Sequence, residues 1–255
     1  MYLNKTDAVV IHCTDFGESD IIATLYTHDL GKIQAIAKGA KRSKKRFINN
    51  LQPFSYIRIV FSEGRGGLIR LDQADIIHPF FAIGEDIFKV LYGSYFLELV
   101  KEMTGEKESN PQLFQALVAF LALLNDSTPR EEYLRAFELR VLDLLGYRPR
   151  LLECTVCTEM IPREEGAWFS YRHGGVLCKG CQTEARGAIP ISGGTLTIME
   201  MALRMDLGEV GGIQFSADAL SESREILPRF IQHQLGKGLK SLKVMEEVQG
   251  GQEVG

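Results

Sequence analysis

Residues 8–37 read AVVIHCTDFGESDIIATLYTHDLGKIQAIA and contain three short stretches rich in β-branched and aromatic residues. The stretches are Ala8–Cys13, Ile21–Thr27 and Lys32–Ala37, and a turn signal at Asp29–Gly31 separates the last two. Such side chains fit a pleated strand, and glycine enters positive φ without steric cost. The segment therefore predicts consecutive β-strands joined by tight turns.

Two further stretches of the same kind, Tyr56–Phe61 and Leu68–Ile77, flank a glycine-rich turn at Glu63–Gly67. Five short strands in 79 residues predict a small β-barrel. The connection from Lys38 to Ser55 is too long for a simple turn, so we expect it to be a functional loop.

After Pro79 the hydrophobic period changes from two to about 3.6, which predicts helices. The first covers 87–103. The second has Asn110 as N-cap and Pro111 at its first position, because an asparagine side chain accepts from early backbone amides and proline has none to leave unpaired. The third is predicted to begin with a capping box at Thr128–Glu131 and to end at Gly146.

Helical periodicity returns at Thr195–Met205 and from Ser216 to about Val248, where Pro228 is expected to kink or interrupt the helix. The predicted fold class is a multi-domain α+β protein. Its parts are a barrel (1–79), a helical domain (80–150 and 188–248), an inserted cysteine-rich segment (151–187) and a disordered tail (249–255).

Four of the five cysteines form two pairs with two-residue spacing, Cys154/Cys157 and Cys178/Cys181. Two tight turns that each present two thiolates can bind one tetrahedral Zn²⁺, and the aromatic stretch between the pairs is typical of a hairpin. We therefore predict a structural zinc site with these four ligands. The alternatives are reduced or disulfide-paired cysteines, or a catalytic zinc that uses His173; four thiolates would leave no open position for catalysis.

The formal net charge of −4 conceals a strong segregation. Residues 31–62 hold eight basic and no acidic side chains, so −4 less 8 leaves about −12 for the rest of the chain. Six of the eight lie between Lys38 and Arg46. Cations release counterions from phosphate, and an aromatic side chain can stack on an unpaired base. The predicted DNA-binding residues are Lys38, Lys41, Arg42, Lys44, Lys45, Arg46 and Phe47.

Two simpler interpretations of these cations remain open: a solvated loop, or a nuclear localisation signal. The sequence contains no phosphate-binding loop, no nucleophile elbow and no H-E-x-x-H motif, so we expect no enzymatic activity. No secretory signal and no apolar stretch of 18 residues is present, so we expect a cytoplasmic protein without membrane contact.

The chain resembles the bacterial recombination mediator family RecO in six stretches that follow one another in order. They are Asp15–Asp20, Lys38–Arg42 with Phe47, Leu51–Phe54, Leu144–Pro149, the cysteine pairs with Gly174–Gly175, and Leu239–Lys243. The resemblance implies that the barrel is an OB-fold and that the cysteine segment is a zinc ribbon set against the helical domain.

The resemblance further implies binding of single- and double-stranded DNA, annealing of complementary strands, and localisation at the bacterial nucleoid. The implied partners are RecR, the C-terminal tail of single-strand-binding protein and, indirectly, the recombinase RecA. Two other classes of function compete with this one: a zinc-ribbon adaptor in transcription or translation, and a nuclease with an unrecognised active site.

Overall fold

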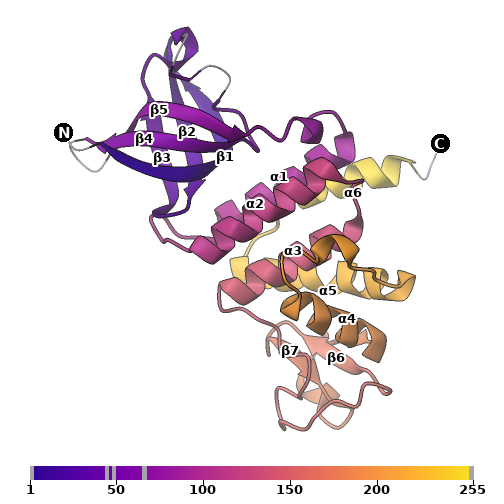
Figure 1. Ribbon diagram of the computed structural model, residues 1–255. Helices are drawn as coiled ribbons and strands as arrows, with labels where there is room; N and C mark the ends of the chain where they lie inside the picture. Colours follow the sequence, from indigo (N-terminus) through magenta and orange to yellow (C-terminus); the bar gives the residue numbers. More distant parts are fainter. Residues whose placement is uncertain (1–2, 44–45, 48–49, 65–67, 253–255) are drawn as a thin grey trace. The chain divides into compact units, whose positions relative to one another are not determined.

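The computed structural model describes the chain except for residues 1–2, 44–45, 48–49, 65–67 and 253–255. It divides into two compact units, which Figure 1 shows with their helices and strands labelled. Unit 1 comprises residues 1–128 and 241–255, and unit 2 comprises Pro129–Lys240.

Five strands form a closed barrel in unit 1. They are β1 (Asn4–Phe16), β2 (Asp20–Thr27), β3 (Gly31–Ala37), β4 (Tyr56–Glu63) and β5 (Ile69–His78). Their order around the barrel is β1-β2-β3-β5-β4, and β4 pairs with β1 to close it. Neighbours are antiparallel except β3 and β5, which run parallel over only three residue pairs. The five-stranded barrel expected from the sequence is confirmed, with β1 longer at both ends.

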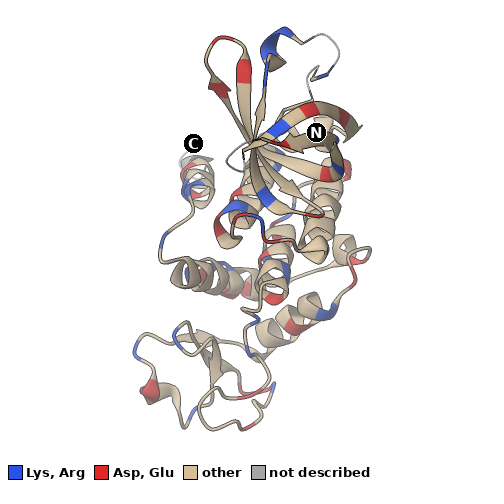
Figure 2. Cartoon of the chain, turned by 90° about the vertical axis from the view of Figure 1, so that its left-hand side faces the viewer, with Lys and Arg blue, Asp and Glu red and all other residues tan. Residues whose placement is uncertain are grey.

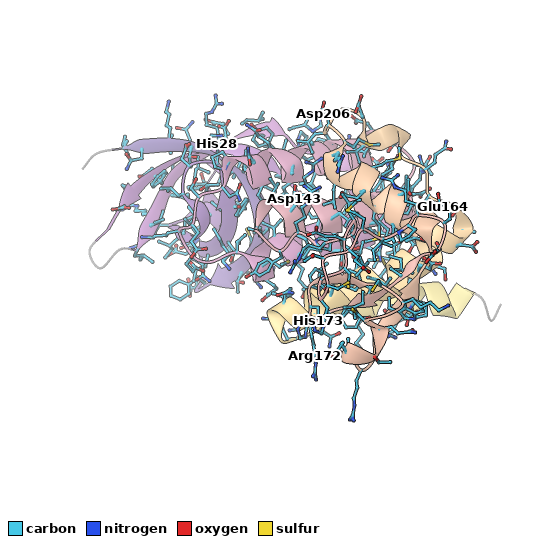
Figure 3. The ribbon with its side chains drawn as sticks, turned by 90° about the horizontal axis from the view of Figure 1, so that it is seen from below. His28, Asp143, Glu164, Arg172, His173 and Asp206 are labelled. Carbon is cyan, nitrogen blue, oxygen red and sulfur yellow. The ribbon has the colours of Figure 1, made fainter. Side chains whose placement is uncertain are left out.

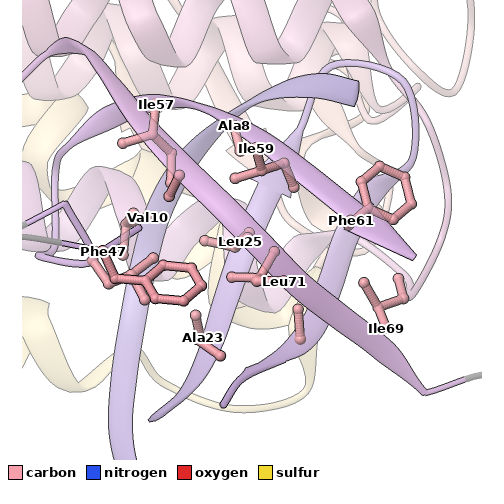
Figure 4. Close-up of a cluster of buried hydrophobic side chains, with 14 of the residues drawn as sticks. Ala8, Val10, Ala23, Leu25, Phe47, Ile57, Ile59, Phe61, Ile69 and Leu71 are labelled. Atoms are coloured by element: carbon pink, nitrogen blue, oxygen red, sulfur yellow. The ribbon is translucent and has the colours of Figure 1, made fainter. Parts of the chain in front are cut away.

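The barrel interior is filled by side chains that alternate along the strands, as expected when one face of each strand is buried (Figure 4). Three additional core side chains, Ala40, Phe47 and Leu51, come from the connection between β3 and β4. The basic connection is therefore also part of the hydrophobic core.

Three helices accompany the barrel in unit 1: α1 (Ile87–Met103), α2 (Pro111–Asp126) and α6 (Lys240–Gln252). A single-turn 3-10 helix, η3 (Phe81–Ile83), precedes α1. The predicted start of α2 is confirmed, because the Asn110 side chain accepts a hydrogen bond from the Leu113 amide at 3.0 Å and Pro111 is the first helical residue. The Glu98 carboxylate accepts from the backbone amide of Ser241 at 2.7 Å and so ties α6 to α1.

The turn between β2 and β3 docks onto the loop that follows α1. Lys32 Nζ donates to the carbonyl oxygens of Lys101 (2.6 Å) and Thr104 (2.5 Å), and Lys107 N donates to Lys32 O at 2.8 Å. Carbonyls at a helix C-terminus have no intrahelical partner and carry partial negative charge, so a lysine ammonium suits them. This lysine therefore stabilises the docking of the barrel onto the helices.

Unit 2 contains three longer helices and a small sheet. The helices are α3 (Glu131–Leu144), α4 (Gly193–Arg204) and α5 (Ala217–Leu235), with two single-turn 3-10 helices, η4 (Gln182–Glu184) and η5 (Val210–Gly212). The strands are β6 (Ala167–Ser170), β7 (Gly175–Leu177) and β8 (Ile189–Ile191), ordered β7-β6-β8. The β6–β7 hairpin between the cysteine pairs is confirmed, and β8 adds a third strand that the sequence did not indicate.

A buried ion pair contributes to the packing of α3 against α5. Arg135 Nη2 lies 3.1 Å from Glu138 Oε1, and Arg135 Nη1 donates to the carbonyl of Ser223 at 3.3 Å. Removing one member would leave a charge without its partner in the core, which is far more costly than losing an exposed pair.

The capping box predicted for α3 is wrong. The N-cap is Arg130, two residues later, and no side chain caps the helix. The Arg130 guanidinium donates to the carbonyl of Ile213 at 2.6 Å and contacts Glu132 at 2.8 Å. These contacts within unit 2 determine where the helix begins, and a local sequence pattern does not contain them.

Two expectations about the C-terminal helices also need correction. Pro228 lies inside α5 and does not interrupt it; the helix ends instead at Leu235, where Gly236 adopts a φ of 69°. Glycine reaches this left-handed conformation without a Cβ clash and so ends the helix. The helix α6 then runs to Gln252, so a disordered tail from residue 249 is wrong for its first four residues, while the last three lie outside the described residues.

The multi-domain α+β class is confirmed by a closed barrel, helices and a cluster of four cysteines inserted between α3 and α4. Across the described residues, every helix is too short or too polar to span a lipid bilayer.

Gly31 provides a test of the docked turn. Its φ is +65°, and a Cβ there would lie 1.9 Å from the carbonyl oxygen of Glu108. Gly31→Ala adds both left-handed strain and a backbone clash, so we expect it to lower the free energy of unfolding by about 3 kcal/mol or more, measured by urea denaturation. The matched control is Gly17→Ala, whose φ of +61° is similar but whose Cβ would meet no atom within 4 Å. It should cost about 1 kcal/mol; equal costs would contradict the close approach.

Candidate nucleic-acid interface and metal centre

The basic segment, defined as Lys38–Phe47, leaves the end of β3 and forms a 3-10 turn, η1 (Ala40–Arg42). Figure 2 shows the described lysines and arginines of the segment at one end of the barrel. The β1–β2 loop holds the segment through backbone contacts: Gly39 N donates to Asp20 Oδ1 at 2.8 Å, and Lys41 N donates to Ser19 O at 3.0 Å. The first half of the segment therefore has a defined position on the barrel.

The other end of the segment is attached to β5. Ala74 N donates to Arg46 O at 3.1 Å, and Asn50 Nδ2 donates to Ala74 O at 2.6 Å. These bonds supply partners to a part of β5 that lies beyond its short pairing with β3. The segment thus completes the barrel wall and also presents cations.

Phe47 is only 5% exposed and packs in the barrel core (Figure 4). The expectation that it stacks on an unpaired base is therefore wrong for this structure. Burial of a Phe side chain stabilises the folded protein by about 1.5–3 kcal/mol relative to leaving the ring in water, so the core position is favoured over an exposed one. It acts instead as an anchor, with the Arg46 guanidinium 5.2 Å from the ring centroid.

Two cations of the segment meet carboxylates of the β1–β2 loop. Lys41 Nζ lies 2.8 Å from Asp15 Oδ2, and Arg42 Nη2 lies 3.4 Å from Glu18 Oε2. The two carboxylates are 76% and 91% exposed. Ion pairs in such solvent-exposed positions contribute little to stability and are screened by salt, so a competing anion can replace them.

The remaining predicted DNA-binding residues are placed as follows. Lys38 and Arg46 are exposed, and Arg46 Nη2 donates to the carbonyl of Lys38 at 3.1 Å. Lys44 and Lys45 lie outside the described residues. The structure thus groups the described cations of the segment at one end of the barrel, with Phe47 beneath them.

Arg58, also within the acid-free stretch, is engaged by the barrel itself. Its Nε and Nη2 contact the Asp7 carboxylate at 2.7 and 3.1 Å. The hydrogen bond from Arg58 is the largest cause that holds the pKa of Asp7 below its usual range, against the opposing effect of burial. Arg58 and Lys32 therefore have structural partners within unit 1. Of the eight basic residues in 31–62, these two are not counted among the candidate DNA contacts.

Asp20 is a positioning residue that the sequence did not single out as part of the site. Hydrogen bonds from the Gly39 amide and the Ser19 hydroxyl, followed by the charge of Lys38, lower the pKa of its carboxyl group. The carboxylate therefore stays ionised and keeps accepting from Gly39 at neutral pH. The only signal in the sequence was the acidic loop Asp15–Asp20, which carried the family resemblance.

The four cysteines predicted as metal ligands lie together in unit 2. Their sulfurs are all within 4.8 Å of one another, and Cys157 Sγ lies 3.7 Å from Cys178 Sγ. Tetrahedral Zn²⁺ with bonds of about 2.3 Å would place its sulfurs ~3.8 Å apart, whereas a disulfide requires about 2.05 Å. All four are free thiols, so the disulfide alternative does not describe this structure. The cluster is a metal-binding arrangement.

Backbone geometry prepares the cluster for a cation. Burial alone raises the pKa of Cys154, but hydrogen bonds from the amides of Cys157, Cys178 and Val156 outweigh it and bring the pKa to about 6. Burial, followed by hydrogen bonds with neighbouring thiols, raises the pKa of Cys181. The Cys154 thiolate therefore forms readily while Cys181 resists ionisation, and a bound cation would favour the charged form of both.

His173, the other residue considered as a ligand, lies outside the four-cysteine cluster. Its Nδ1 is 2.9 Å from Ser170 Oγ, within the turn between β6 and β7. Figure 3 labels it beside Arg172. The four-thiolate set thus matches the structural type of site rather than the catalytic type, in which three protein ligands leave a position open.

Barrel, helices and a four-cysteine ribbon define a two-unit α+β protein with a metal-binding insertion. Residues 1–80 match the family "Recombination protein O N terminal", and residues 84–243 match "Recombination protein O C terminal". The chain belongs to the recombination protein O (RecO) family, whose N-terminal domain is an OB-fold.

Curated relatives cover nearly the whole chain. A protein of Syntrophus aciditrophicus is 36% identical over 249 residues, 96% of each chain. One of Myxococcus xanthus is 36% identical over 242 residues (95% of this chain, 96% of the relative), and one of Bacillus pumilus is 32% identical over 248 residues (97% and 95%). Each of these relatives is named "DNA repair protein RecO".

Asp20→Asn tests how the basic segment is held. The amide side chain is a weaker acceptor for Gly39 N than a carboxylate, and it removes the charge that faces Lys38. We expect faster tryptic cleavage within the segment, followed by mass spectrometry of the native protein. The control is Asp75→Asn, because the side chain of that exposed residue on β5 accepts from Gln73. Equal cleavage rates in both variants would contradict the tether.

Proposed function

We propose that the chain is a DNA-binding recombination mediator: it binds single- and double-stranded DNA, anneals complementary strands and acts in recombinational DNA repair. The observation that carries the proposal is the basic segment: backbone bonds hold Gly39 and Lys41 to the barrel, while the side chains of its four described cations, Lys38, Lys41, Arg42 and Arg46, are exposed. The names of the relatives, DNA repair proteins, support the same function.

The charge distribution favours phosphate as the ligand. Each lysine or arginine that neutralises a phosphate releases condensed counterions, a gain that exposed ion pairs with Asp15 and Glu18 do not match. DNA therefore exchanges for these carboxylates when it binds. The exchange also keeps binding independent of sequence, because the segment would contact the backbone and not the base edges.

Annealing requires no bond to be made or broken in the DNA backbone. It requires two strands to be brought together with their mutual repulsion screened while their bases remain free to pair. Cations held at one end of a barrel provide that screening. The proposed function therefore contains no catalytic step, in line with the absence of catalytic motifs in the sequence.

We further propose that the protein works with RecR to load RecA onto DNA covered by single-strand-binding protein, in the bacterial cytoplasm at the nucleoid. Recognition of an acidic, apolar C-terminal tail requires a pocket that is both basic and apolar. A hollow of about 250 Å³ in unit 2 includes Arg148, Arg150, Leu151 and Met160 in its lining, together with Glu153 and Glu200. Arg148 contacts Glu200 at 3.2 Å, a pair that an incoming carboxylate would have to replace.

The metal that we propose for the four-cysteine cluster is Zn²⁺, because four thiolates within 4.8 Å of one another can close the tetrahedral coordination shell of this ion. Cys154, Cys157, Cys178 and Cys181 would hold it. Zinc would supply no chemistry to DNA. It would replace the hydrophobic core that so short a segment cannot build.

The basic segment is tested by replacing Lys41, Arg42, Lys44 and Lys45 with alanine. Affinity should fall roughly equally for all sequences, and the plot of log affinity against log salt should become shallower by up to about 3 to 4 for duplex DNA. Fluorescence anisotropy over a salt series measures both. The variant should also anneal complementary oligonucleotides more slowly, with or without single-strand-binding protein.

Arg58→Ala is the matched control, since it removes a cation of the same acid-free stretch that is paired with Asp7. Its DNA affinity should match that of the wild type. Unchanged affinity in the four-alanine variant at moderate salt would exclude the segment from the interface. Preference for RNA over DNA would favour the adaptor alternative, and Mg²⁺-dependent cleavage of end-labelled DNA would favour the nuclease.

The zinc proposal is tested with Cys154→Ser/Cys178→Ser. Structural zinc contributes on the order of ten kcal/mol in model peptides, so the double variant should lose metal and melt at a lower temperature, while its DNA affinity per folded molecule changes less. Metal analysis, calorimetry and anisotropy measure the three quantities. Cys13→Ser, outside the cluster, should retain metal. A metal-free double variant with an unchanged melting temperature would refute the structural role.

A further inference from the structure

Phe16, the last residue of β1, is 53% exposed at the tip of the β1–β2 hairpin. An isolated exposed apolar residue is common and by itself means little. Phe16 differs in its surroundings, because the loop that carries it is the loop that holds the basic segment. Phe16 is thus an exposed aromatic ring beside the basic segment, the role that the sequence analysis had assigned to Phe47.

The register of the barrel fixes the face on which Phe16 lies. Phe16 pairs with Asp20 across the hairpin, and paired residues share a face of the sheet. The Asp20 carboxylate accepts from Gly39 N at 2.8 Å, and the charge of Lys38 is among the causes that lower its pKa. Phe16 therefore shares its face with Asp20, where the basic segment begins.

The next row of the same outer face continues the surface across four strands. Thr14 pairs with Ile22, Ile22 with Ile36, and Ile36 with Arg70. Ile22 is half-buried and Ile36 is buried, so the middle of the row is apolar. The outer face of β1, β2, β3 and β5 thus has an aromatic at one corner, apolar residues in its middle and a cation at its edge.

The charges around the ring select the part of a nucleic acid that can approach it. Asp15 and Glu18, on either side of Phe16–Gly17, repel a phosphate but not an uncharged base. Phosphates would instead follow the cations of the basic segment. A base in a duplex has both faces covered by its neighbours, whereas an unpaired base presents a free face for stacking.

We propose that Phe16 is a stacking platform for an unpaired base, so that the β1–β2 hairpin and the described cations Lys38, Lys41, Arg42 and Arg46 together form a subsite for single-stranded nucleic acid. This inference rests on the proposed DNA-binding function and adds to it a residue that separates single strands from duplexes. The basic segment would supply affinity for any phosphate backbone. Phe16 would add a preference for strands whose bases are free.

The experiment compares three ligands of equal length: an oligothymidylate, a strand of the same phosphates with abasic sites, and a blunt duplex. Anisotropy titrations use the full-length, metal-loaded protein with Phe16→Ala, Phe16→Leu and Phe16→Trp, after thermal unfolding shows that each variant is folded. A stacked base contributes about 1–3 kcal/mol, or roughly 5- to 100-fold in affinity. Alanine and leucine should lose this factor for oligothymidylate, and tryptophan should retain it.

None of the three variants should change binding of the abasic strand or the duplex. Phe81→Ala is the matched control, because this ring in η3 is 71% exposed but lies outside the β1–β2 hairpin, and its affinity for every ligand should equal that of the wild type. Fluorescence of Phe16→Trp should be quenched by oligothymidylate and not by the abasic strand, against the background of the single native tryptophan.

The outcomes separate the two proposals. Wild-type binding with no loss in Phe16→Ala overturns the platform alone, as does an equal loss on the abasic strand, which would show a structural role. A leucine variant with full affinity overturns stacking in favour of a general apolar contact. A wild type that binds neither strand at moderate salt overturns the proposed function and the platform with it.

Discussion

The parallel pairing of β3 and β5 extends over only three residue pairs, and the connection from β3 to β4 provides what the pairing leaves out. Arg46 O and the Asn50 side chain bond to Ala74, and Phe47 fills part of the interior. The basic segment is therefore a structural element of the barrel. The backbone bonds of Gly39, Lys41 and Arg46 hold the described part of the segment against the barrel, and its described cations are carried on that backbone.

In the basic segment, bonds made by the backbone fix the position of the chain, and the ion pairs made by the side chains are weak. Backbone bonds to Asp20 and Ser19 position the segment, whereas the ion pairs of Lys41 and Arg42 are exposed and easily exchanged. The β1–β2 loop thus holds the segment firmly but leaves its charges available.

The cysteine-rich insertion of unit 2 needs a source of stability other than a hydrophobic core of its own. The segment between α3 and α4 contains only three short strands of 4, 3 and 3 residues, too little regular structure for an independent hydrophobic core. Four thiolates that approach one another repel, and a divalent cation turns this repulsion into a cross-link. The hydrogen bonds to Cys154 prepare the first ligand. Phe169 then contacts Phe230 of α5 at 5.4 Å, which connects the sheet of the cysteine-rich insertion to the helices of the same unit.

Local pattern and spacing determined the five barrel strands, the α2 cap at Asn110 and the cysteine cluster, because each depends on neighbours in the chain or on a repeated short motif. The sequence could not show whether Phe47 faces solvent or the core, because an aromatic residue beside cations has the same local pattern in both cases. Closure of the barrel places its ring in the core. The start of α3 at Arg130 and the break at Gly236 likewise followed tertiary contacts and backbone conformation. Charge segregation was visible in the sequence, but which cations are exposed and which have structural partners depended on carboxylates and carbonyls that folding alone brings near.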